Sequence, residues 1–346
     1  MSKNTNLNQA KTEKNPEFYT LYKDVEVEMN AYISHDKNVF KNKTILCPCD
    51  DPEWSNFTRY FAANFERLGI KKLISTSYAR SASNKQISLF EQESEQFDKQ
   101  KHETHGKIFV AERGKYEGHM NEGNLKWQYL EGDGDFRSDE VTALRNEADM
   151  IITNPPFHLF REFIAWIMEG DKKFSVIGNM NSITCKEIFP LIKSDEIWLG
   201  TTSPKVFIQP DGKEKKFGNI CWYTNLEHGV RHEPLQLMTM KQNLKYNKKL
   251  IKILTKSYCK VEYPHYDNYD ALEVPYSDAI PSDYDGVVGV PISFLYKYCP
   301  EQFEIVGASE QCGKGFSNGI WRSDSKVSHP TINKQKVYSR ILIKRK

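Results

Sequence analysis

Short apolar segments alternate with amphipathic segments over residues 44–199. Apolar runs of strand length predict strands at 44–47, 71–75, 127–130, 150–153, 173–178 and 196–199. Apolar residues at helical spacing predict helices at 55–69, 138–147, 157–169 and 183–193. This alternation is typical of an α/β fold with a mostly parallel sheet and helices on both faces. Ligands of such folds bind at the carboxyl ends of the strands, so polar motifs at those ends are the candidates for function.

The pattern divides the chain into three regions. Residues 1–15 are rich in Asn, Lys and Thr and are expected to form a disordered tail. Residues 16–225 carry the α/β pattern, and a polar segment rich in Gln and Glu interrupts it at 80–125, where we expect an insertion. Residues 226–346 form a C-terminal region with a weaker pattern, expected to pack against the α/β domain because no flexible linker separates them.

Several features indicate a cytoplasmic protein. The first fifteen residues are polar, and no apolar run approaches the roughly 18 residues that would suggest a membrane span, so we expect no membrane partner. Seven scattered cysteines predict reduced thiols rather than a disulfide framework. Cys47 and Cys49 form a single C-x-C pair with no second pair or histidine cluster, so no metal site is expected.

Positive charge is concentrated in one stretch of a nearly neutral chain. The net charge of the whole protein is +2, whereas residues 200–260 contain 12 Lys and Arg against 4 Asp and Glu, a local balance of +8. A basic region on a nearly neutral protein is typical of a polyanionic partner that binds one face. A solvated, lysine-rich surface with no partner explains the charge equally well.

The strongest motif is the tetrapeptide Asn154-Pro155-Pro156-Phe157, between a predicted strand and a predicted helix. An exocyclic aromatic amine is a poor nucleophile, because its lone pair is delocalised into the ring. An asparagine oxygen and the next carbonyl can accept hydrogen bonds from such an amine and direct its lone pair toward a methyl donor. The prolines would hold these acceptors rigidly, and Phe157 can stack on a base. The alternative is an ordinary loop before a helix.

A second motif, Asp50-Asp51-Pro52, follows the first predicted strand, and Ser55 opens the next helix. The glycine pattern of a dinucleotide-binding loop is missing. S-adenosyl-L-methionine has no phosphate and therefore needs no such loop. An aspartate can neutralise its ammonium group, and a helix N-terminus favours its carboxylate. The alternative is an Asx-type turn with a helix cap.

The segment Gly132-Asp133-Gly134-Asp135-Phe136 follows another predicted strand and competes with Asp50-Asp51-Pro52 for the role of main cofactor loop. Asp135 could accept a hydrogen bond from the cofactor's adenine, and Phe136 could flank its ring; a glycine turn without a ligand is the alternative. The chain contains no G-x-x-x-x-G-K-[ST] loop, G-x-S-x-G elbow or H-E-x-x-H motif. ATPase, serine hydrolase and zinc protease activities therefore lack support.

Together these segments resemble the EcoRI-type adenine-specific DNA methyltransferases. The resemblance extends from PEFYT at Pro16 to the terminal RILIK, through CDDPEWSNF, EGDGDFRS, IITNPPFHLFREF, NSITCKEIFPLIK, YDNYDALEV and DYDGVVGVPISFLYKYCPEQFEIV. It implies a Rossmann-like class I methyltransferase fold, S-adenosyl-L-methionine as cofactor, double-stranded DNA as substrate and N6-methyladenine as product.

The resemblance also assigns roles to individual residues. It places Phe18, Tyr19, Thr20, Asp50, Asp51, Pro52, Asp135 and Phe136 at the cofactor, and Asn154, Pro155, Pro156 and Phe157 in the catalytic loop. Residues 80–125 and 200–262 match the family less well, and no acid stands near Ser75–Tyr78, where related enzymes commonly bind the cofactor ribose.

We expect the C-terminal region to recognise DNA. Lys241, Lys245, Lys248 and Lys249 are candidates for phosphate contacts, and Phe207 is either a second base-stacking residue or a core residue. A monomer is expected, with a cognate restriction endonuclease, if present, acting separately. Two rival functions remain: N-methylation of RNA or of protein glutamine, and DNA binding by a relative that has lost catalysis.

Overall fold

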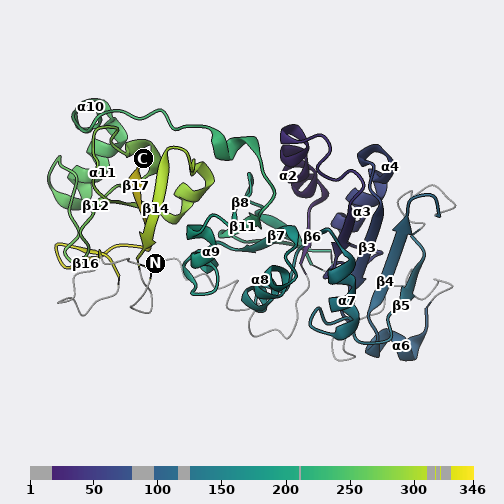
Figure 1. Cartoon of the computed structure of the whole chain (residues 1–346). Coiled ribbons are helices and arrows are strands. Elements are labelled where there is room, and N and C mark those ends of the chain that lie inside the picture. Colours follow the sequence, from purple (N-terminus) through teal and green to yellow (C-terminus); the bar gives the residue numbers. More distant parts are fainter. Residues whose placement is uncertain are drawn as a thin grey trace. The chain divides into compact units, whose positions relative to one another are not determined.

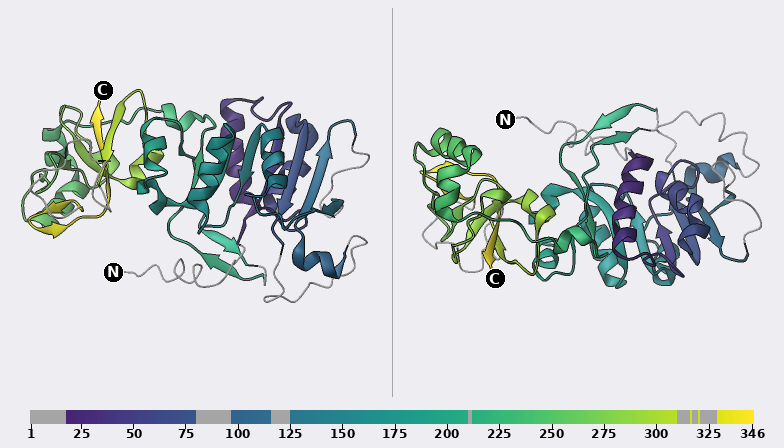
Figure 2. Two further views of the ribbon diagram at one scale, coloured as in Figure 1. Left: turned by 60° about the horizontal axis from the view of Figure 1, so that its bottom comes forward. Right: turned by 90° about the horizontal axis from the view of Figure 1, so that it is seen from above.

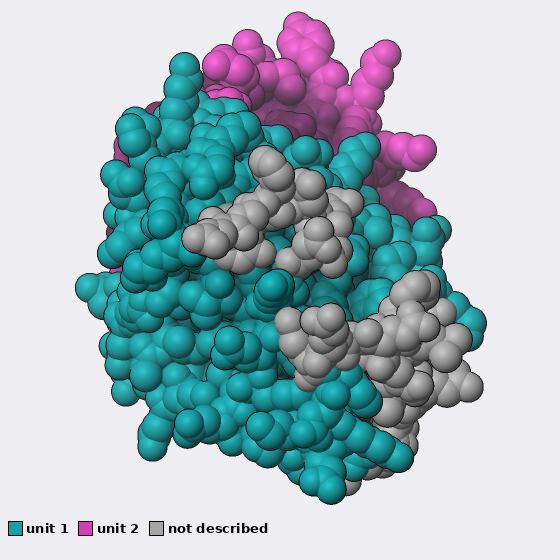
Figure 3. Space-filling model, turned by 90° about the vertical axis from the view of Figure 1, so that its right-hand side faces the viewer, with its two compact units in different colours: residues 1–179, 200–227 teal, residues 180–199, 228–346 magenta. Residues whose placement is uncertain are grey.

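A computed structural model describes residues 18–79, 97–115, 125–209, 212–309, 316, 320 and 329–346 (Figure 1). The tail expected at 1–15 lies outside these residues. The chain divides into two compact units, which Figure 3 colours separately. Unit 1 comprises residues 1–179 and 200–227, and unit 2 comprises residues 180–199 and 228–346.

Unit 1 contains the alternating strands and helices. Its strands are β1 (Tyr19–Thr20), β2 (Thr44–Cys47), β3 (Lys72–Ser77), β4 (Lys107–Glu112), β5 (Trp127–Tyr129), β6 (Met150–Thr153), β7 (Lys173–Asn179), β9 (Val206–Ile208), β10 (Glu214–Lys216) and β11 (Ile220–Thr224). Its helices are α2 (Tyr22–His35), α3 (Asn56–Ala63), α4 (Phe65–Leu68), α6 (Lys99–Thr104), α7 (Asp139–Glu147) and α8 (Phe160–Glu169).

The large sheet of unit 1 has the strand order β5-β4-β3-β2-β6-β7-β11. Its centre is parallel, because β2 pairs in parallel with β3 and β6, and β6 pairs in parallel with β7. The outer pairs β3–β4, β4–β5 and β7–β11 are antiparallel. The expected parallel sheet is therefore confirmed at its centre and not at its flanks. Strand β4 lies within the segment 80–125 that the sequence marks as an insertion.

Helices cover both faces of this sheet (Figure 2). On one face, Val25 and Met29 of α2 and Phe57 of α3 share a buried core with Ile45 and Cys47 of β2. On the other face, α8 packs so closely that a Cβ atom at Gly178 would stand 2.3 Å from the Phe160 ring. Only a residue without a side chain fits there.

Three helices differ from their predicted bounds for identifiable reasons. The helix expected at 55–69 is divided at Asn64 into α3 and α4, and Gly69 ends it in the left-handed conformation. The helix expected at 157–169 begins at Phe160, because a turn from Pro156 to Leu159 precedes it. The helix expected at 183–193 is replaced by a 3-10 turn at Met180–Thr184 and a short helix, because Pro190 is tolerated only in a first helical turn.

Unit 2 has a smaller sheet of order β12-β13-β17-β14. The strands of unit 2, in and outside this sheet, are β8 (Trp198–Leu199), β12 (Leu272–Glu273), β13 (Val288–Pro291), β14 (Phe303–Ala308), β15 (Thr331–Ile332), β16 (Gln335–Lys336) and β17 (Arg340–Arg345). Its helices are α9 (Phe189–Lys193), α10 (Met240–Tyr246) and α11 (Lys248–Tyr258), with 3-10 turns η2 (Met180–Thr184), η3 (Gly229–His232), η4 (Ser277–Ala279) and η5 (Ile292–Lys297).

A buried ion pair stabilises the sheet of unit 2. The Arg340 guanidinium of β17 donates two hydrogen bonds, of 2.9 and 2.6 Å, to the Glu273 carboxylate of β12, and the Tyr266 hydroxyl donates to the same carboxylate. Buried charges require partners of this kind.

None of the helices in the described parts of the chain combines the length and apolar character needed to cross a membrane.

Candidate active site

The polar motifs meet at the carboxyl edge of the sheet in unit 1. Asn154 directly follows β6, and two residues separate Asp50 from the end of β2. Because β2 and β6 are parallel neighbours, with Leu46 paired to Ile151, their ends lie side by side. The fold therefore brings together two loops that are about a hundred residues apart in the sequence.

The two polar atoms of the Asn154 side chain differ in their bonding within the protein. Its Nδ2 donates a 2.6 Å hydrogen bond to the Phe18 carbonyl, which sets the orientation of the amide. Its Oδ1 is buried and has no hydrogen-bond partner among the described residues. Buried polar atoms are nearly always paired in folded proteins, so an unpaired acceptor at a strand end suits a ligand that donates a hydrogen bond.

The segment Phe18-Tyr19-Thr20 reaches this edge through a small second sheet. Strand β1 pairs antiparallel with β9, and β9 pairs with β10. Asn56 of α3 donates a 2.7 Å hydrogen bond to the Thr20 carbonyl. The Thr20 hydroxyl is buried and, like the Trp54 indole N–H, lacks a partner among the described residues. The unpaired Asn154 and Thr20 atoms thus lie on segments that the sequence assigns to the site, and Trp54 lies two residues beyond Pro52.

Phe157 belongs to an aromatic cluster beside Asn154. Its half-buried ring lies nearly parallel to Phe18, with centroids 6.5 Å apart, and edge-on to Phe207 and Phe217. Phe207 has no exposed surface and packs on Phe217 at 5.4 Å. Of the two roles that the sequence leaves open for Phe207, this position favours the core role. Pro155 is buried and Pro156 is exposed.

Asp50 is buried, and groups of the protein occupy both of its oxygens. Ser55 donates to one oxygen at 2.6 Å, and Thr153 donates to the other at 2.5 Å. The backbone N–H of Asn154 also favours the charged form of this carboxylate and so lowers its pKa. Burial raises the pKa of Asp50 to about 7, and the bonds from Ser55 and Thr153 oppose that shift.

Asp51 faces a lysine from β4. The Lys107 ammonium is buried, lies 3.7 Å from the Asp51 carboxylate and forms an ion pair with Glu53. It also stands over the Trp127 ring, 4.5 Å from its centroid. Pro52 is buried between these two acids in the chain. Lys107 therefore holds the loop after β2, a role for which the polar segment around it gave no sequence pattern.

The loop Gly132–Phe136 is attached to the end of β3. Gly134 has φ +78, and a Cβ atom there would stand 2.2 Å from the Ser77 carbonyl oxygen, so only glycine fits. The Ala79 N–H donates a 2.7 Å hydrogen bond to the Asp133 carbonyl. This contact places the loop at the same edge of the sheet as Asp50.

The two predicted cofactor residues of this loop contact other side chains. Arg137 donates to both oxygens of Asp135, at 2.9 and 2.7 Å, and this bonding lowers the pKa of the Asp135 carboxyl. The Phe136 ring is buried and lies edge-on to Phe163 and Trp166. In this arrangement Phe136 is a packing residue.

The predicted DNA-contacting lysines lie on two consecutive helices of unit 2. Lys241 and Lys245 belong to α10, Lys248 and Lys249 belong to α11, and all four are exposed. Two of them stand over aromatic rings, since the Lys249 ammonium lies 4.0 Å from the centroid of the Tyr276 ring and the Lys245 ammonium lies 4.9 Å from that of Tyr246. Leu250 and Leu254 turn the apolar side of α11 inward, so the lysines occupy its outer side.

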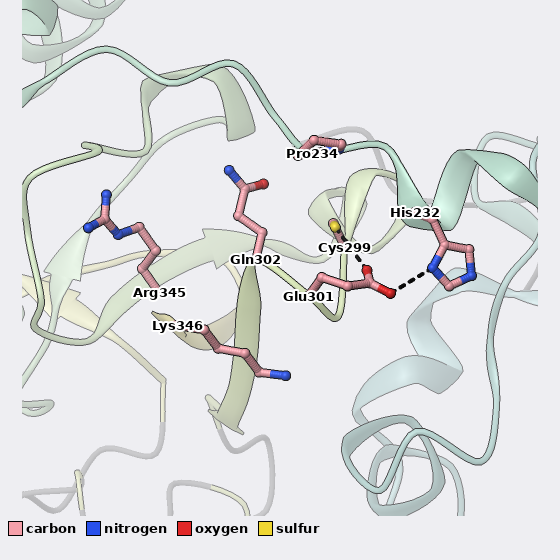
Figure 4. Close-up of a pocket in the computed structure, with 7 residues that line it drawn as sticks. All are labelled: His232, Pro234, Cys299, Glu301, Gln302, Arg345 and Lys346. Atoms are coloured by element: carbon pink, nitrogen blue, oxygen red, sulfur yellow. Dashed lines mark hydrogen bonds and ion pairs between the residues drawn. The ribbon is translucent and has the colours of Figure 1, made fainter.

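A shallow pocket in unit 2, of about 420 Å³, is a second candidate (Figure 4). His232, Cys299, Glu301, Arg345 and Lys346 are among its lining residues. The Glu301 carboxylate in this pocket already accepts hydrogen bonds from His232 at 2.8 Å and from Cys299 at 3.2 Å. The pocket offers no unpaired catalytic group. No cluster of three metal-binding side chains occurs in the described ranges.

Comparison with known proteins gives a consistent result. The model of a family described as adenine-specific methyltransferase EcoRI matches residues 6–346. The chain is 38% identical to the Type II methyltransferase M.EcoRI of Escherichia coli, over 98% of this chain and 96% of that protein. It is 31% identical to the Type II methyltransferase M.MpnI of Mycoplasma pneumoniae, over 87% and 84% of the two chains. It is 32% identical to M.MgeORF184P of Mycoplasma genitalium, over 87% and 85%. No solved structure matches.

Proposed function

The chain belongs to the EcoRI family of adenine-specific methyltransferases, and we propose that this site-specific DNA methyltransferase transfers a methyl group to the N6 amino group of adenine in double-stranded DNA. The observation that carries this proposal is the unpaired Oδ1 of Asn154, held in place by the bond from Nδ2 to Phe18. The large sheet with a parallel centre supports a Rossmann-like class I fold.

The catalytic loop acts by accepting hydrogen bonds. Asn154 Oδ1 and the Pro155 carbonyl accept the two hydrogens of the adenine amino group and direct its lone pair outward. Proline at 155 and 156 limits movement of these acceptors. The mechanism needs no metal ion, and unchanged activity in excess chelator would support that expectation.

S-adenosyl-L-methionine fits the residues at this edge as the methyl donor. Its sulfonium supplies an activated methyl group. Asp51 and the N-terminus of α3 are suited to its ammonium and carboxylate, and the buried Thr20 hydroxyl offers a further polar contact. The loop Asp135–Phe136 would contact its adenine only if Asp135 exchanges its bonds from Arg137 for a bond from the cofactor.

The target base has to leave the duplex to reach Asn154. The adenine amino group is paired inside the helix, and extruding the base costs a few kcal/mol. Stacking on an aromatic ring recovers about 1–3 kcal/mol of this cost. Phe157 follows the catalytic prolines directly and is half-buried, so we assign it this stacking role.

Unit 2 is proposed to recognise the DNA. Lys241, Lys245 and Lys248 are exposed on α10 and α11, which suits phosphate contacts along the backbone. The protein would act as a monomer in the cytoplasm. A restriction endonuclease of the same specificity, where present, would act separately.

Product analysis tests the proposal. The protein is incubated with labelled S-adenosyl-L-methionine and, in parallel, with duplex DNA, RNA and a glutamine-containing protein, and the duplex is digested to nucleosides. We expect label in N6-methyladenine from duplex DNA. Label only in methylcytosine, RNA or protein would overturn the proposal, and cofactor binding without any transfer would favour the inactive DNA-binding relative.

A further inference from the structure

We infer that Asp50 is a positioning residue for the catalytic loop and not a ligand of the cofactor's ammonium group. The inference rests on the proposed function and refines it. Sequence patterns place Asp50 and Asp51 together as cofactor residues. The structure gives these neighbouring carboxylates different partners. From this difference we assign cofactor binding to Asp51 and the positioning of Asn154 to Asp50.

The hydrogen bonds of Asp50 connect three segments of unit 1. Ser55, the cap of α3, donates to Oδ1, and Thr153, the last residue of β6, donates to Oδ2. Asp50 itself stands in the loop after β2, and its own N–H bonds to the Thr76 carbonyl of β3. A carboxylate with these partners fixes Thr153, the residue directly before Asn154.

The bonding leaves Asp50 little capacity for a ligand. Both of its oxygens already accept bonds from the protein, so a ligand would have to compete with Ser55 and Thr153. The titratable groups that interact with it are the Asp51 carboxylate and the thiols of Cys47 and Cys49. Among the residues that the structure describes, no side-chain cation pairs with it. A charge buried without a cation is costly, and such a group is typically found where its hydrogen bonds serve function.

Asp51 has the opposite surroundings. Its carboxylate is as buried as that of Asp50, but it lies 3.7 Å from Lys107 of β4 and accepts the Glu53 N–H of its own loop at 2.9 Å. Asp51 is therefore the acid of this pair suited to the cofactor, and Asp50 is the acid that positions the catalytic asparagine.

Two substitutions at Thr153 test the inference without removing a buried charge. Thr153→Val keeps the shape of the side chain and loses the hydroxyl, whereas Thr153→Ser keeps the hydroxyl. We expect Thr153→Val to lower the single-turnover methylation rate at saturating cofactor roughly ten- to hundredfold, as for loss of a hydrogen bond to a charged group, and Thr153→Ser to restore most of it. The dissociation constant of S-adenosyl-L-methionine, measured by calorimetry, is expected to change less than about threefold.

Asp50→Asn and Asp51→Asn form the second pair. An asparagine at 50 keeps the shape but cannot accept from both Ser55 and Thr153, so we expect a lower rate with nearly normal cofactor affinity. Asp51→Asn is expected to do the reverse, weakening cofactor binding and leaving more of the rate at saturation. Circular dichroism of both variants identifies a general loss of fold, and the Thr153 pair decides the question if Asp50→Asn does not fold.

A pH profile gives a readout that a purely structural role would not move. Burial raises the pKa of Asp50 to about 7, and the protonated carboxyl loses one acceptor. The rate at saturating cofactor should fall as the pH drops below about 7 in the natural protein, and this inflection should be missing in Asp50→Asn.

The outcomes separate this inference from the proposed function. A normal rate in Thr153→Val, or a loss confined to cofactor affinity in Asp50→Asn, would overturn the positioning role while leaving the methyltransferase activity intact. Absence of N6-methyladenine with the natural protein would instead overturn the proposed function itself.

Discussion

The catalytic edge of unit 1 and the basic helices of unit 2 are built in opposite ways. At the catalytic edge, Thr153 is bound to Asp50 and Asn154 to the Phe18 carbonyl by short hydrogen bonds, and polar atoms are buried. On α10 and α11, lysines extend into solvent. The difference indicates that the chemistry depends on a few exact positions, whereas DNA attraction is shared among many charges. Single substitutions should therefore be severe in the first region and mild in the second.

Asn154→Ala should have the largest effect. Loss of one polar group that stabilises a transition state costs roughly a hundred- to thousandfold in turnover. Single-turnover methylation of duplex DNA measures this loss, and calorimetry with S-adenosyl-L-methionine should show nearly unchanged binding. A variant that retains a tenth of the normal rate would contradict the expected difference between the two regions. The catalytic edge would then tolerate a substitution as well as an exposed surface does.

The pH dependence of stability should show a smaller effect at the same edge. Folding raises the pKa of Asp50 to about 7 from its ordinary 3.8, so the folded state holds this proton more tightly than the unfolded state. The resulting stabilisation is complete below pH 3.8 and is lost as the pH rises through 7. Each unit of pKa difference is worth about 1.4 kcal/mol, so the effect reaches a few kcal/mol.

Urea unfolding of the natural protein and of Asp50→Asn at pH 5 and pH 8 measures this contribution. Between these values the natural protein should lose more of its free energy of unfolding than the variant does. Equal losses would show that Asp50 keeps an ordinary pKa and that burial does not isolate the catalytic edge from solvent.

Phe157→Ala should cost less than Asn154→Ala. Stacking of a base on an aromatic ring is worth about 1–3 kcal/mol, so methylation should slow roughly five- to 150-fold. With 2-aminopurine at the target position, the natural protein should change the fluorescence on binding, and the variant should give a different signal. A target base that stays stacked in the bound complex would contradict the flipping step.

The lysines of α10 and α11 should give the smallest effect per residue. Each phosphate contact removed should make the slope of log affinity against log salt shallower by about 0.9. Replacing Lys241, Lys245 and Lys248 together by Gln should therefore flatten the slope, measured by fluorescence anisotropy. Lys249→Gln is the matched control for the single variant Lys248→Gln and should matter less, because the Lys249 ammonium already stands 4.0 Å from the centroid of the Tyr276 ring. An unchanged slope in the triple variant would identify a solvated surface with no DNA contact.

Local patterns in the sequence predict the strands and helices of unit 1 well. The helix opened by Ser55 is found because a cap, an apolar face and a final glycine all lie within fifteen residues. Strand β4 is not found, because Lys107–Glu112 is one short alternating run among polar residues. Periodicity indicates on which face of its own helix or strand a residue lies. It does not indicate which distant strand lies beside that element.

The site shows the same limit. The Asn154 loop is recognisable because four adjacent residues carry its chemistry. The bond from Thr153 to Asp50 joins residues 103 positions apart, and the approach of Lys107 to Asp51 depends on β4 lying beside β3. The buried position of Phe136 likewise follows from the packing of α8 and not from its motif.

The carbonyl of Phe18 determines which amino acid can stand at position 154. An amide presents a donor to this carbonyl and still has an acceptor for the substrate. An ionised aspartate of the same shape would present only acceptors, and one of them would face the Phe18 oxygen with like partial charge. Exchange of amide for acid would thus misorient the side chain without changing its size. Any attempt to redesign the acceptor specificity of this loop has to change the N-terminal strand together with the loop.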